Sequence, residues 1–271
     1  MDDRTSTAPL RHRGPEHSWE PLRRAVSERG SGVVFGAVDD WLPPDLADPA
    51  LIAALGPDHA RLVRMPPTRG RDRFVAARML LKHASSAVLG TLPAELELAY
   101  KPGGRPYLRG IDQLDVGLSH TEGLLVVGLT RFGRIGVDTE PADRRMLDLG
   151  TEASACTPYE LEELRRVPAP LRNRELVRLW TLKEAYSKAI GQGLRFRFTE
   201  FGFGRLDGRV RLLSPDGLPG TGPEWSFDSW LVDDAYTVSA AVFDSDFGDR
   251  REDTGPKPLL PVLRDPRSSA S

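Results

Sequence analysis

The sequence predicts a mixed α/β or α+β fold, because helix-like and strand-like segments both occur without a clean β–α–β alternation. Residues 71–90 repeat apolar side chains every three or four positions, which is typical of an amphipathic helix. Residues 124–130 and 135–140 flank a four-residue loop and predict a hairpin. Residues 157–160 read Thr-Pro-Tyr-Glu, which combines a capping box with proline at the first helical position.

The remaining elements follow in chain order. Residues 33–38 are expected to form a buried strand that ends before Pro43 and Pro44. A second long helix is expected over about residues 171–190, stopping at the glycine pair that begins with Gly191. Further strands are expected at residues 196–203, 210–213, 225–232 and 236–243.

The folded body is expected to span residues 31–245. Residues 1–30 are rich in Arg, Ser, Glu and Pro, and residues 246–271 are charged and then rich in Pro and Ser. Such segments bury too little apolar surface to offset the entropy lost on ordering, so both are predicted to be disordered tails.

The composition excludes several classes of protein. The chain of 271 residues has 37 Lys+Arg and 39 Asp+Glu, a net charge of −2, which argues against a general nucleic-acid binder. A single cysteine, Cys156, excludes an intramolecular disulfide framework and a cysteine-rich zinc site. Neither a secretory signal nor an apolar run long enough for a membrane span is visible, so we expect a cytoplasmic protein without membrane contact.

Two acidic residues stand out in the strand at residues 135–140. Asp138 and Glu140 are two positions apart and therefore share one face of the strand, about 7 Å apart along the backbone. Converging carboxylates form a hard oxygen site that suits Mg²⁺. The alternative is a solvated edge strand that passes into a turn.

The second helix carries a Trp-Thr-Leu-Lys-Glu-Ala-Tyr-Ser-Lys segment. Trp180, Glu184 and Lys188 follow one another at four-residue spacing, with Lys183 adjacent to that face. In a functional interpretation Glu184 is a third metal carboxylate, and both lysines bind phosphate as point charges. Alternatively, Glu184 and Lys188 form an exposed pair and Trp180 is an ordinary core residue.

Other candidates lie near turns. Ser119 and His120 can both contact phosphate, although no Gly-X-Ser-X-Gly elbow marks the serine as a nucleophile. Arg105 lies in a Gly/Pro loop whose glycines permit close approach of a ligand, or which is simply a turn. Glu160 is explained completely by the capping box, so its position alone favours a structural role.

In their order and spacing these motifs resemble the 4′-phosphopantetheinyl transferases, and the length resembles the Sfp-type, monomeric branch. The resemblance covers roughly residues 33–243. It implies two similar α/β halves related by pseudo-twofold symmetry, at residues 31–140 and 141–245, with coenzyme A between them.

The resemblance assigns roles to ten positions. It places Mg²⁺ at Asp138, Glu140 and Glu184. It places coenzyme A phosphates at Lys183 and Lys188, at Ser119 and His120, and, for the 3′-phosphate, at Arg73. It also places Arg105 at coenzyme A. Arg105 stands where the family often has lysine, which keeps the charge but changes the geometry. Glu160 matches a glutamate proposed as general base, and Lys188 is expected to donate a proton to the leaving group.

The activity implied is transfer of the 4′-phosphopantetheine arm of coenzyme A to a serine of an apo acyl or peptidyl carrier protein, with release of adenosine 3′,5′-bisphosphate. Such carriers belong to fatty-acid, polyketide or nonribosomal-peptide synthesis. They tend to be acidic, and four arginines are candidates for a basic rim that attracts them, or form a solvated helix face: Arg165, Arg166, Arg172 and Arg174. The alternatives are another Mg²⁺-dependent phosphotransferase or hydrolase, and a non-catalytic module that binds carrier proteins or coenzyme A.

Overall fold

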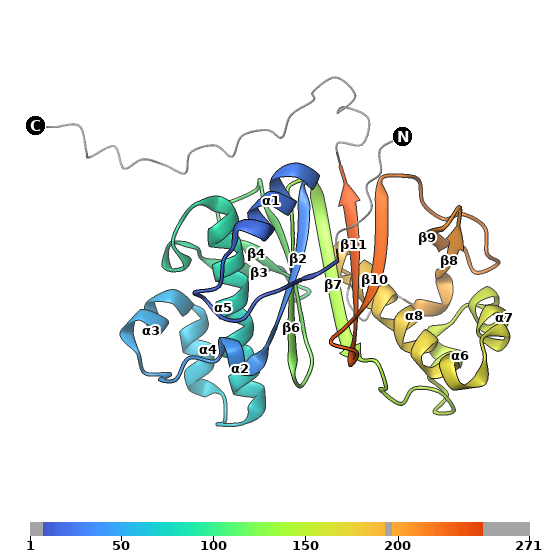
Figure 1. The fold of residues 1–271 in the computed structure, drawn as a ribbon, viewed down its shortest axis with the longest axis horizontal. Coiled ribbons are helices and arrows are strands. Elements are labelled where there is room, and N and C mark those ends of the chain that lie inside the picture. The colour runs from blue at the N-terminus through green and yellow to red at the C-terminus, as the bar shows by residue number, and fades with distance from the viewer. Residues whose placement is uncertain (1–7, 193–196, 246–271) are drawn as a thin grey trace, which may run out of the picture.

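The computed structural model describes residues 8–192 and 197–245 and confirms the mixed α+β class. Two sheets face each other, and helices cover the outer face of each, which gives four layers (Figure 1). The first sheet has the order β1 (Leu10–Arg11), β2 (Ser31–Ala37), β6 (Leu124–Thr130) and β5 (Asp115–His120). The second has the order β10 (Trp225–Val232), β11 (Tyr236–Asp244) and β7 (Gly133–Pro141).

Three apolar cores hold these layers together. Because side chains alternate along a strand, the first sheet contributes one face to each of two cores. Val34 points into the core beneath the first long helix, whereas its neighbours Val33 and Phe35 point into the core between the sheets. Val137 and Val238 of the second sheet meet them there. The third core lies between the second sheet and the second long helix. Burial between the two sheets therefore fixes how they lie against each other.

The two long helices are α5 (Arg69–Leu89) and α8 (Ala169–Ile190), close to their predicted ranges. Both end at a glycine in the left-handed conformation, Gly90 and Gly191. The predicted capping box is present in α7 (Pro158–Arg166), where Thr157 and Glu160 cap each other. The shorter helices are α1 (Glu20–Arg29), α2 (Val38–Trp41), α3 (Pro49–Leu55), α4 (Asp58–Arg64) and α6 (Thr151–Ala155).

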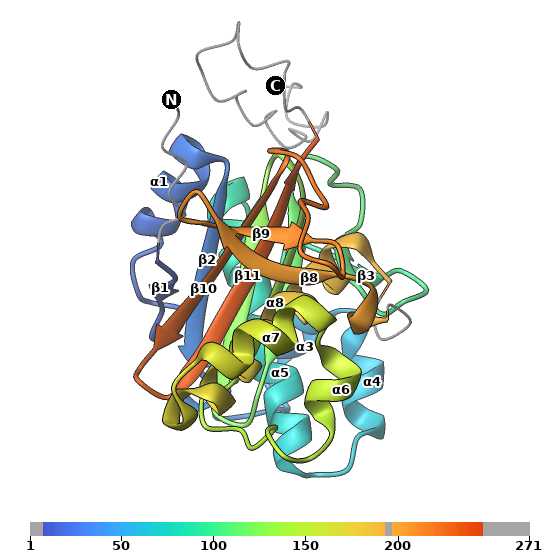
Figure 2. The same ribbon diagram turned by 90° about the vertical axis from the view of Figure 1, so that its right-hand side faces the viewer.

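Most predicted strands are confirmed. Residues 225–232 and 236–243 correspond to β10 and β11, and residues 210–213 to β9 (Arg209–Leu213). The segment predicted at 196–203 begins outside the described residues, and its described part is a 3₁₀ turn, Phe198–Glu200, followed by the start of β8 (Gly202–Leu206). The hairpin β8–β9 lies beside α7 (Figure 2). A smaller hairpin joins β3 (Leu98–Tyr100) to β4 (Pro106–Leu108).

The predicted hairpin between β6 and β7 is wrong, although both strands exist. β6 is hydrogen-bonded to β2 on one side and β5 on the other, whereas β7 is hydrogen-bonded to β11. All seven residues of β6 are buried, as expected for a strand with a neighbour at each edge. The chain thus crosses from one sheet to the other between β6 and β7. The expected boundary between halves at residue 140 falls inside β7, which pairs with the second sheet along its whole length.

The prediction of a disordered tail over residues 1–30 is wrong for residues 8–30. β1 pairs with β2, and α1 buries Leu22 and Val26 in the first core. The ring of His12 stacks on that of Trp19 at 3.4 Å. A few large side chains therefore anchor a segment whose composition is mostly polar. Residues 1–7 and 246–271 lie outside the described residues. Across the described ranges, the helices are too short or too polar to cross a membrane.

Candidate functional site

Side chains from both sheets and from α8 meet at one point. Ser119 at the end of β5 donates a hydrogen bond from Oγ to Asp138 Oδ1 of β7 at 2.9 Å. Lys188 Nζ, from the last turn of α8, donates to the same Asp138 oxygen at 2.5 Å and to Ser119 Oγ at 3.1 Å. The Asp138 residue is only 5% exposed, and its Oδ2 is buried without a hydrogen-bond partner. An unsatisfied carboxylate oxygen at this depth is an available ligand for a cation or donor.

Gly136 allows α8 to approach β7 closely enough to build this point. A Cβ at Gly136 would lie 1.9 Å from the backbone oxygen of Ala185 in α8, so only glycine fits. Because Glu184 and Lys188 are four residues apart, they lie on the same face of α8. The close contact at Gly136 therefore brings that face towards Asp138.

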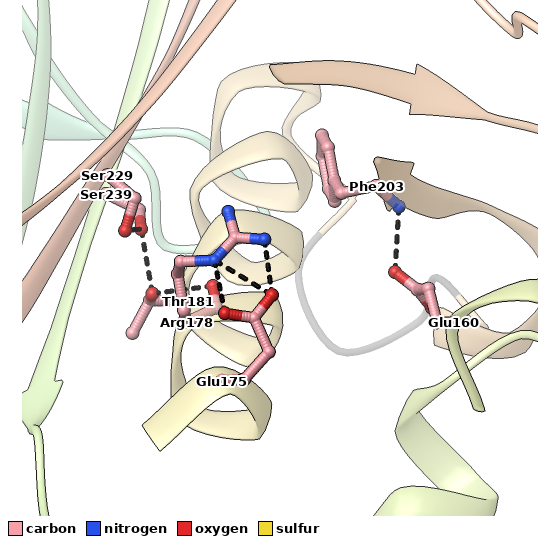
Figure 3. A network of polar contacts seen from close by, with 7 residues as sticks. All are labelled: Glu160, Glu175, Arg178, Thr181, Phe203, Ser229 and Ser239. Atoms are coloured by element: carbon pink, nitrogen blue, oxygen red, sulfur yellow. Dashed lines mark hydrogen bonds and ion pairs between the residues drawn. The ribbon is translucent and has the colours of Figure 1, made fainter. Parts of the chain in front are cut away.

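A row of hydrogen-bonded hydroxyl groups also fixes the orientation of α8 on the second sheet (Figure 3). The hydroxyls of Thr181 and Ser239 are 2.7 Å apart, and Ser239 donates to Ser229 at 3.0 Å. Ser239 is the register partner of Asp138 in the neighbouring strand. Thr181 and Ser239 are fully buried, so their hydroxyls favour one rotation of α8, since another would leave them unpaired.

Glu140 and Glu184 complete an acidic cluster around Asp138. Burial raises the pKa of Glu140, and the charge of Asp138 raises it further, against the opposing charge of Arg144. Burial and the charges of Asp138 and Glu140 likewise raise the pKa of Glu184. Arg144 forms an ion pair with Glu140. The negative charge of Asp138 thus disfavours ionisation of both glutamates, and a proton or a cation would relieve that repulsion.

The donor set fits a divalent cation, although it is not arranged as a finished metal centre. Within residues 8–192 and 197–245, no group of three or more His, Cys, Asp or Glu side chains forms a metal-binding cluster by itself. The free Oδ2 of Asp138 and the raised pKa values of Glu140 and Glu184 are what a hard cation would relieve. Carboxylate oxygens from this chain and phosphate oxygens from a ligand would together make such a site.

A cavity of about 220 Å³ opens beside the Ser119–Asp138–Lys188 contact. Its lining is Arg78, Tyr100, Gly104, Pro106, Leu118, Ser119, His120 and Lys188. Desolvation by the surrounding protein and the charges of Arg73, Arg78 and Lys188 lower the pKa of His120. Cations that repel one another in this way are stabilised by an anion, which makes the cavity suited to phosphate.

The structure places Arg73 within electrostatic reach of His120, and its Nε is buried without a hydrogen-bond partner. Sequence reasoning missed Arg78 and Tyr100 as cavity-lining residues. Arg78 packs over the ring of Phe74 at 3.9 Å and bonds to Asp58 at 3.4 Å. The signal available in the sequence was that Arg78 lies in the middle of a largely apolar helix. An arginine that is buried at such a position needs a partner or a function.

Glu160 and Lys183 lie outside this cavity, in the third core. Glu160 Oε2 accepts from the Thr157 amide at 2.8 Å and from Lys183 Nζ at 2.6 Å, while Oε1 accepts from the Phe203 amide at 2.7 Å, a bond drawn in Figure 3. Lys183 also donates to three backbone carbonyls, those of Ala155, Phe198 and Phe201. The two residues are 1% and 0% exposed.

The geometry of α8 explains why Lys183 and Lys188 have different partners. Lys183 and Lys188 are five positions apart, which rotates one side chain from the other by about 140° around the helix. Lys188 therefore faces Asp138 while Lys183 faces Glu160. Burial lowers the pKa of Lys183, against the opposing influence of Glu160. The contacts of Glu160 and Lys183 favour the structural alternative that the capping box left open.

Arg105 is also bonded within the protein. Its two terminal nitrogens reach Asp115 at 3.1 and 2.5 Å, and one of them donates to the Ile135 carbonyl at 3.0 Å. Two of the candidate rim arginines, Arg165 and Arg166, show the features of a solvated helix face. Arg165 and Arg166 pair with neighbouring glutamates of α7, and Arg172 donates to the Val167 carbonyl.

One family model and several known proteins are similar in sequence to this chain. A family model described as the 4′-phosphopantetheinyl transferase superfamily matches residues 134–241, which include the acidic cluster and α8. The 4′-phosphopantetheinyl transferase HetI of Nostoc sp. is 31% identical over 197 residues, 71% of this chain and 80% of the relative. The chain belongs to the 4′-phosphopantetheinyl transferase superfamily.

Other transferases of this superfamily are also similar to the chain. A phosphopantetheinyl transferase of Thraustochytrium sp. is 30% identical over 222 residues, 76% of each chain. A 4′-phosphopantetheinyl transferase of Bacillus subtilis is 26% identical over 147 residues, 54% of this chain and 64% of the relative. The chain is accordingly an enzyme of the phosphopantetheinyl transferase type.

Proposed function

We propose that this enzyme transfers the 4′-phosphopantetheine arm of coenzyme A to a serine hydroxyl of an apo acyl or peptidyl carrier protein. The observation that carries the proposal is the meeting of Ser119, Asp138 and Lys188 beside a cavity lined with cationic side chains. Coenzyme A concentrates negative charge at its pyrophosphate and 3′-phosphate, and this cavity is suited to such groups. The named activity of the relatives supports the same reaction.

In this proposal Asp138, Glu140 and Glu184 hold Mg²⁺ against the pyrophosphate. The bound ion would polarise the phosphorus under attack and offset the charge that develops in the transition state. The unpaired Oδ2 of Asp138 and the raised pKa values of the two glutamates support this assignment.

The side chains of the cavity position the coenzyme. Lys188 supplies positive charge to phosphate oxygens, and Arg73 extends that field towards the 3′-phosphate. His120, whose pKa is lowered by burial and by these cations, contributes an imidazole N–H hydrogen bond to a phosphate oxygen. The serine oxygen of the carrier forms a bond to the phosphorus of the pantetheine arm, and the bond from that phosphorus to the bridging pyrophosphate oxygen breaks. The serine proton passes to a solvent water, adenosine 3′,5′-bisphosphate leaves, and we assign Lys188 as the donor of a proton to the departing oxygen. Positioning and electrostatics supply most of the catalysis in such a transfer.

Glu160 and Lys183 take a different part in this proposal from the one the family resemblance implies. Both are sealed in the third core and fully hydrogen-bonded, so we assign them to holding α7, β8 and α8 together. They keep the second half rigid beneath Lys188 and Glu184. No contact with substrate or proton transfer is assigned to Glu160.

The test is intact-protein mass spectrometry of apo carrier proteins incubated with the enzyme, coenzyme A and Mg²⁺. An acyl carrier and a peptidyl carrier are run in parallel, with chelator, Asp138→Asn and the exposed control Asp112→Asn. We expect a mass gain of one phosphopantetheine arm that is lost with chelator and in Asp138→Asn but kept in Asp112→Asn. Coenzyme consumption without carrier modification would instead identify a hydrolase, and coenzyme binding without any product would identify a binding module.

A further inference from the structure

Arg105 and Asp115 form a bracket around the backbone of one residue in β7, Ile135. The guanidinium of Arg105 bonds both carboxylate oxygens of Asp115 and also donates to the Ile135 carbonyl at 3.0 Å. Asp115 Oδ2 in turn accepts from the Ile135 amide at 2.8 Å. Both backbone polar groups of Ile135 are thus satisfied by one side-chain pair. The side chains of the pair are 8% and 18% exposed, so water screens them little.

The Arg105–Asp115 bracket lies at the edge of β7 that is opposite its hydrogen-bonded neighbour, β11. The backbone ladder of β7 runs to β11, and the opposite edge of β7 faces β5. The strands come close there, because a Cβ at Gly117 of β5 would lie 3.1 Å from the Ile135 carbonyl oxygen. Buried backbone groups at such an edge cost free energy when they are unpaired. Arg105 and Asp115 remove that cost and tie β7 to β5 at a single register.

That register determines where the catalytic groups meet. Asp115 begins β5, which ends at Ser119 and His120, and Ile135 lies three residues before Asp138 on β7. The two strands are therefore joined at two places, by the bracket and by the Ser119–Asp138 hydrogen bond. The loop that carries Arg105 also touches α8, since a Cβ at Gly103 would lie 3.3 Å from the Gly191 carbonyl oxygen. A shift of β7 along β5 would move Asp138 away from Ser119 and Lys188.

We propose that Arg105 and Asp115 are positioning residues that set the register of β7 and thereby place Asp138 for the transfer. This inference rests on the proposed function and replaces the coenzyme A contact that the family resemblance implied for Arg105. Asp115 had no role in that interpretation. A lysine at position 105 would keep the positive charge but cannot form the fork that reaches Asp115 and Ile135 together.

The experiment compares Arg105→Lys and Asp115→Asn with the exposed control Arg109→Lys, which alters the surface pair of Arg109 with Glu97. Steady-state transfer to an apo carrier gives kcat and the KM for coenzyme A. We expect both bracket variants to lower kcat by about 10- to 100-fold, because small misplacements of reacting groups have effects of this size. The KM for coenzyme A should change by less than about threefold. Arg109→Lys should match the wild type.

A direct contact between Arg105 and coenzyme A gives the opposite pattern. Arg105→Lys would then raise KM with kcat preserved, and Asp115→Asn, which frees the guanidinium, would leave KM unchanged or lower it. Either result would overturn the proposal. Non-additive effects in the double variant would support the bracket, whereas simple additivity would contradict it.

Hydrogen exchange at the Ile135 amide tests the bracket without using activity. The amide should exchange at least about tenfold faster in Arg105→Lys and Asp115→Asn than in the wild type, with overall folding checked by the exchange of the β6 amides. Unchanged protection of Ile135 would overturn the proposal even if activity falls. If the two variants exchange faster at Ile135 but the wild-type enzyme transfers no phosphopantetheine, then the bracket exists while the proposed function fails.

Discussion

The two long helices of this enzyme are built alike but carry different chemistry. Both contain a Leu-Lys-X-Ala-X-Ser sequence, at residues 81–86 in α5 and 182–187 in α8. In each, the lysine is buried and donates to a backbone carbonyl 28 residues earlier, at Ala54 for Lys82 and at Ala155 for Lys183. Each helix then ends at a left-handed glycine.

The difference lies in the residue after each lysine and in what the helix faces. In α8 that residue is Glu184, which joins the acidic cluster with Asp138. In α5 it is His83, whose ring lies 5.6 Å from that of Trp41. The lysines differ too, because Lys183 has a carboxylate hydrogen-bonded to it, in Glu160, whereas Lys82 has Asp58 and Glu97 only as more distant charges. The comparison shows that α5 and α8 share a buried lysine and a glycine end, whereas α8 has Glu184 and α5 has His83 at the next position.

The largest contrast is expected between the two buried lysines. Lys183→Met leaves the carboxylate of Glu160 buried without its partner, which should lower the free energy of unfolding by about 3–5 kcal/mol. Lys82→Met removes a hydrogen bond to a neutral carbonyl and should cost no more than about 1–2 kcal/mol. Urea unfolding of both variants measures the difference. Equal losses would show that the Glu160–Lys183 pair adds nothing to the shared scaffold.

The residues that follow the lysines should differ in catalysis. Glu184→Gln removes a charge from the acidic cluster and should lower kcat for transfer by about 10²- to 10³-fold. His83→Gln, at the corresponding place in α5, should stay within about threefold of the wild type. Steady-state kinetics with an apo carrier at saturating coenzyme A checks both variants. A comparable loss in His83→Gln would mean that α5 shares in the chemistry.

Glu160→Gln separates a structural role from a role as general base. Loss of the charge paired with Lys183 should destabilise the fold by about 1–3 kcal/mol. At a temperature where the variant is folded, kcat should fall by less than about tenfold, and the pH–rate profile should keep its shape. A general base would show a loss of about 10²- to 10⁴-fold. The exposed Glu162→Gln on the same helix is the control.

The smallest effect is expected at His12, beside α5. Burial and the nearby His17 lower the pKa of His12 to about 4, below the ordinary histidine value of about 6.5. Between these values the unfolded chain binds a proton that folded His12 does not, so stability falls as the pH decreases from about 6.5 to 4. His12→Phe should flatten this part of a plot of melting temperature against pH, whereas His59→Gln should not. An unchanged slope in His12→Phe would place the acid sensitivity elsewhere.

Local signals in the sequence were sufficient for some elements and not for others. The periodicity of α5, the capping box of α7 and the glycine that ends α8 depend on neighbouring residues, and all were predictable. The pairing of β7 with β11 was not, because Val137 meets Ala240 from far along the chain and a hairpin rule considers only the loop. The order of residues 8–30 was missed because a few large side chains outweigh a polar composition.

The site could be predicted as a set of residue types but not as contacts. Asp138 and Lys188 come together in the structure, as the motifs suggested. Lys183 lies in the same motif but is buried and bonded to the Ala155 carbonyl, and the sequence does not distinguish such a lysine from one that binds phosphate. The bonding of Arg105 to Asp115 and Ile135 depends on how β5 lies against β7, which no local pattern encodes. Packing between the two sheets decides these outcomes.

The central claim is that the acidic cluster of β7 and α8 holds a divalent cation and that α5 has no counterpart. Electron paramagnetic resonance with Mn²⁺, titrated into the enzyme with coenzyme A present, tests it by counting bound ions in the wild type, Asp138→Asn and His83→Gln. We expect one ion for each chain in the wild type and in His83→Gln, and a loss of about tenfold or more in affinity in Asp138→Asn. Equal binding in Asp138→Asn, or no binding in the wild type, would contradict the claim.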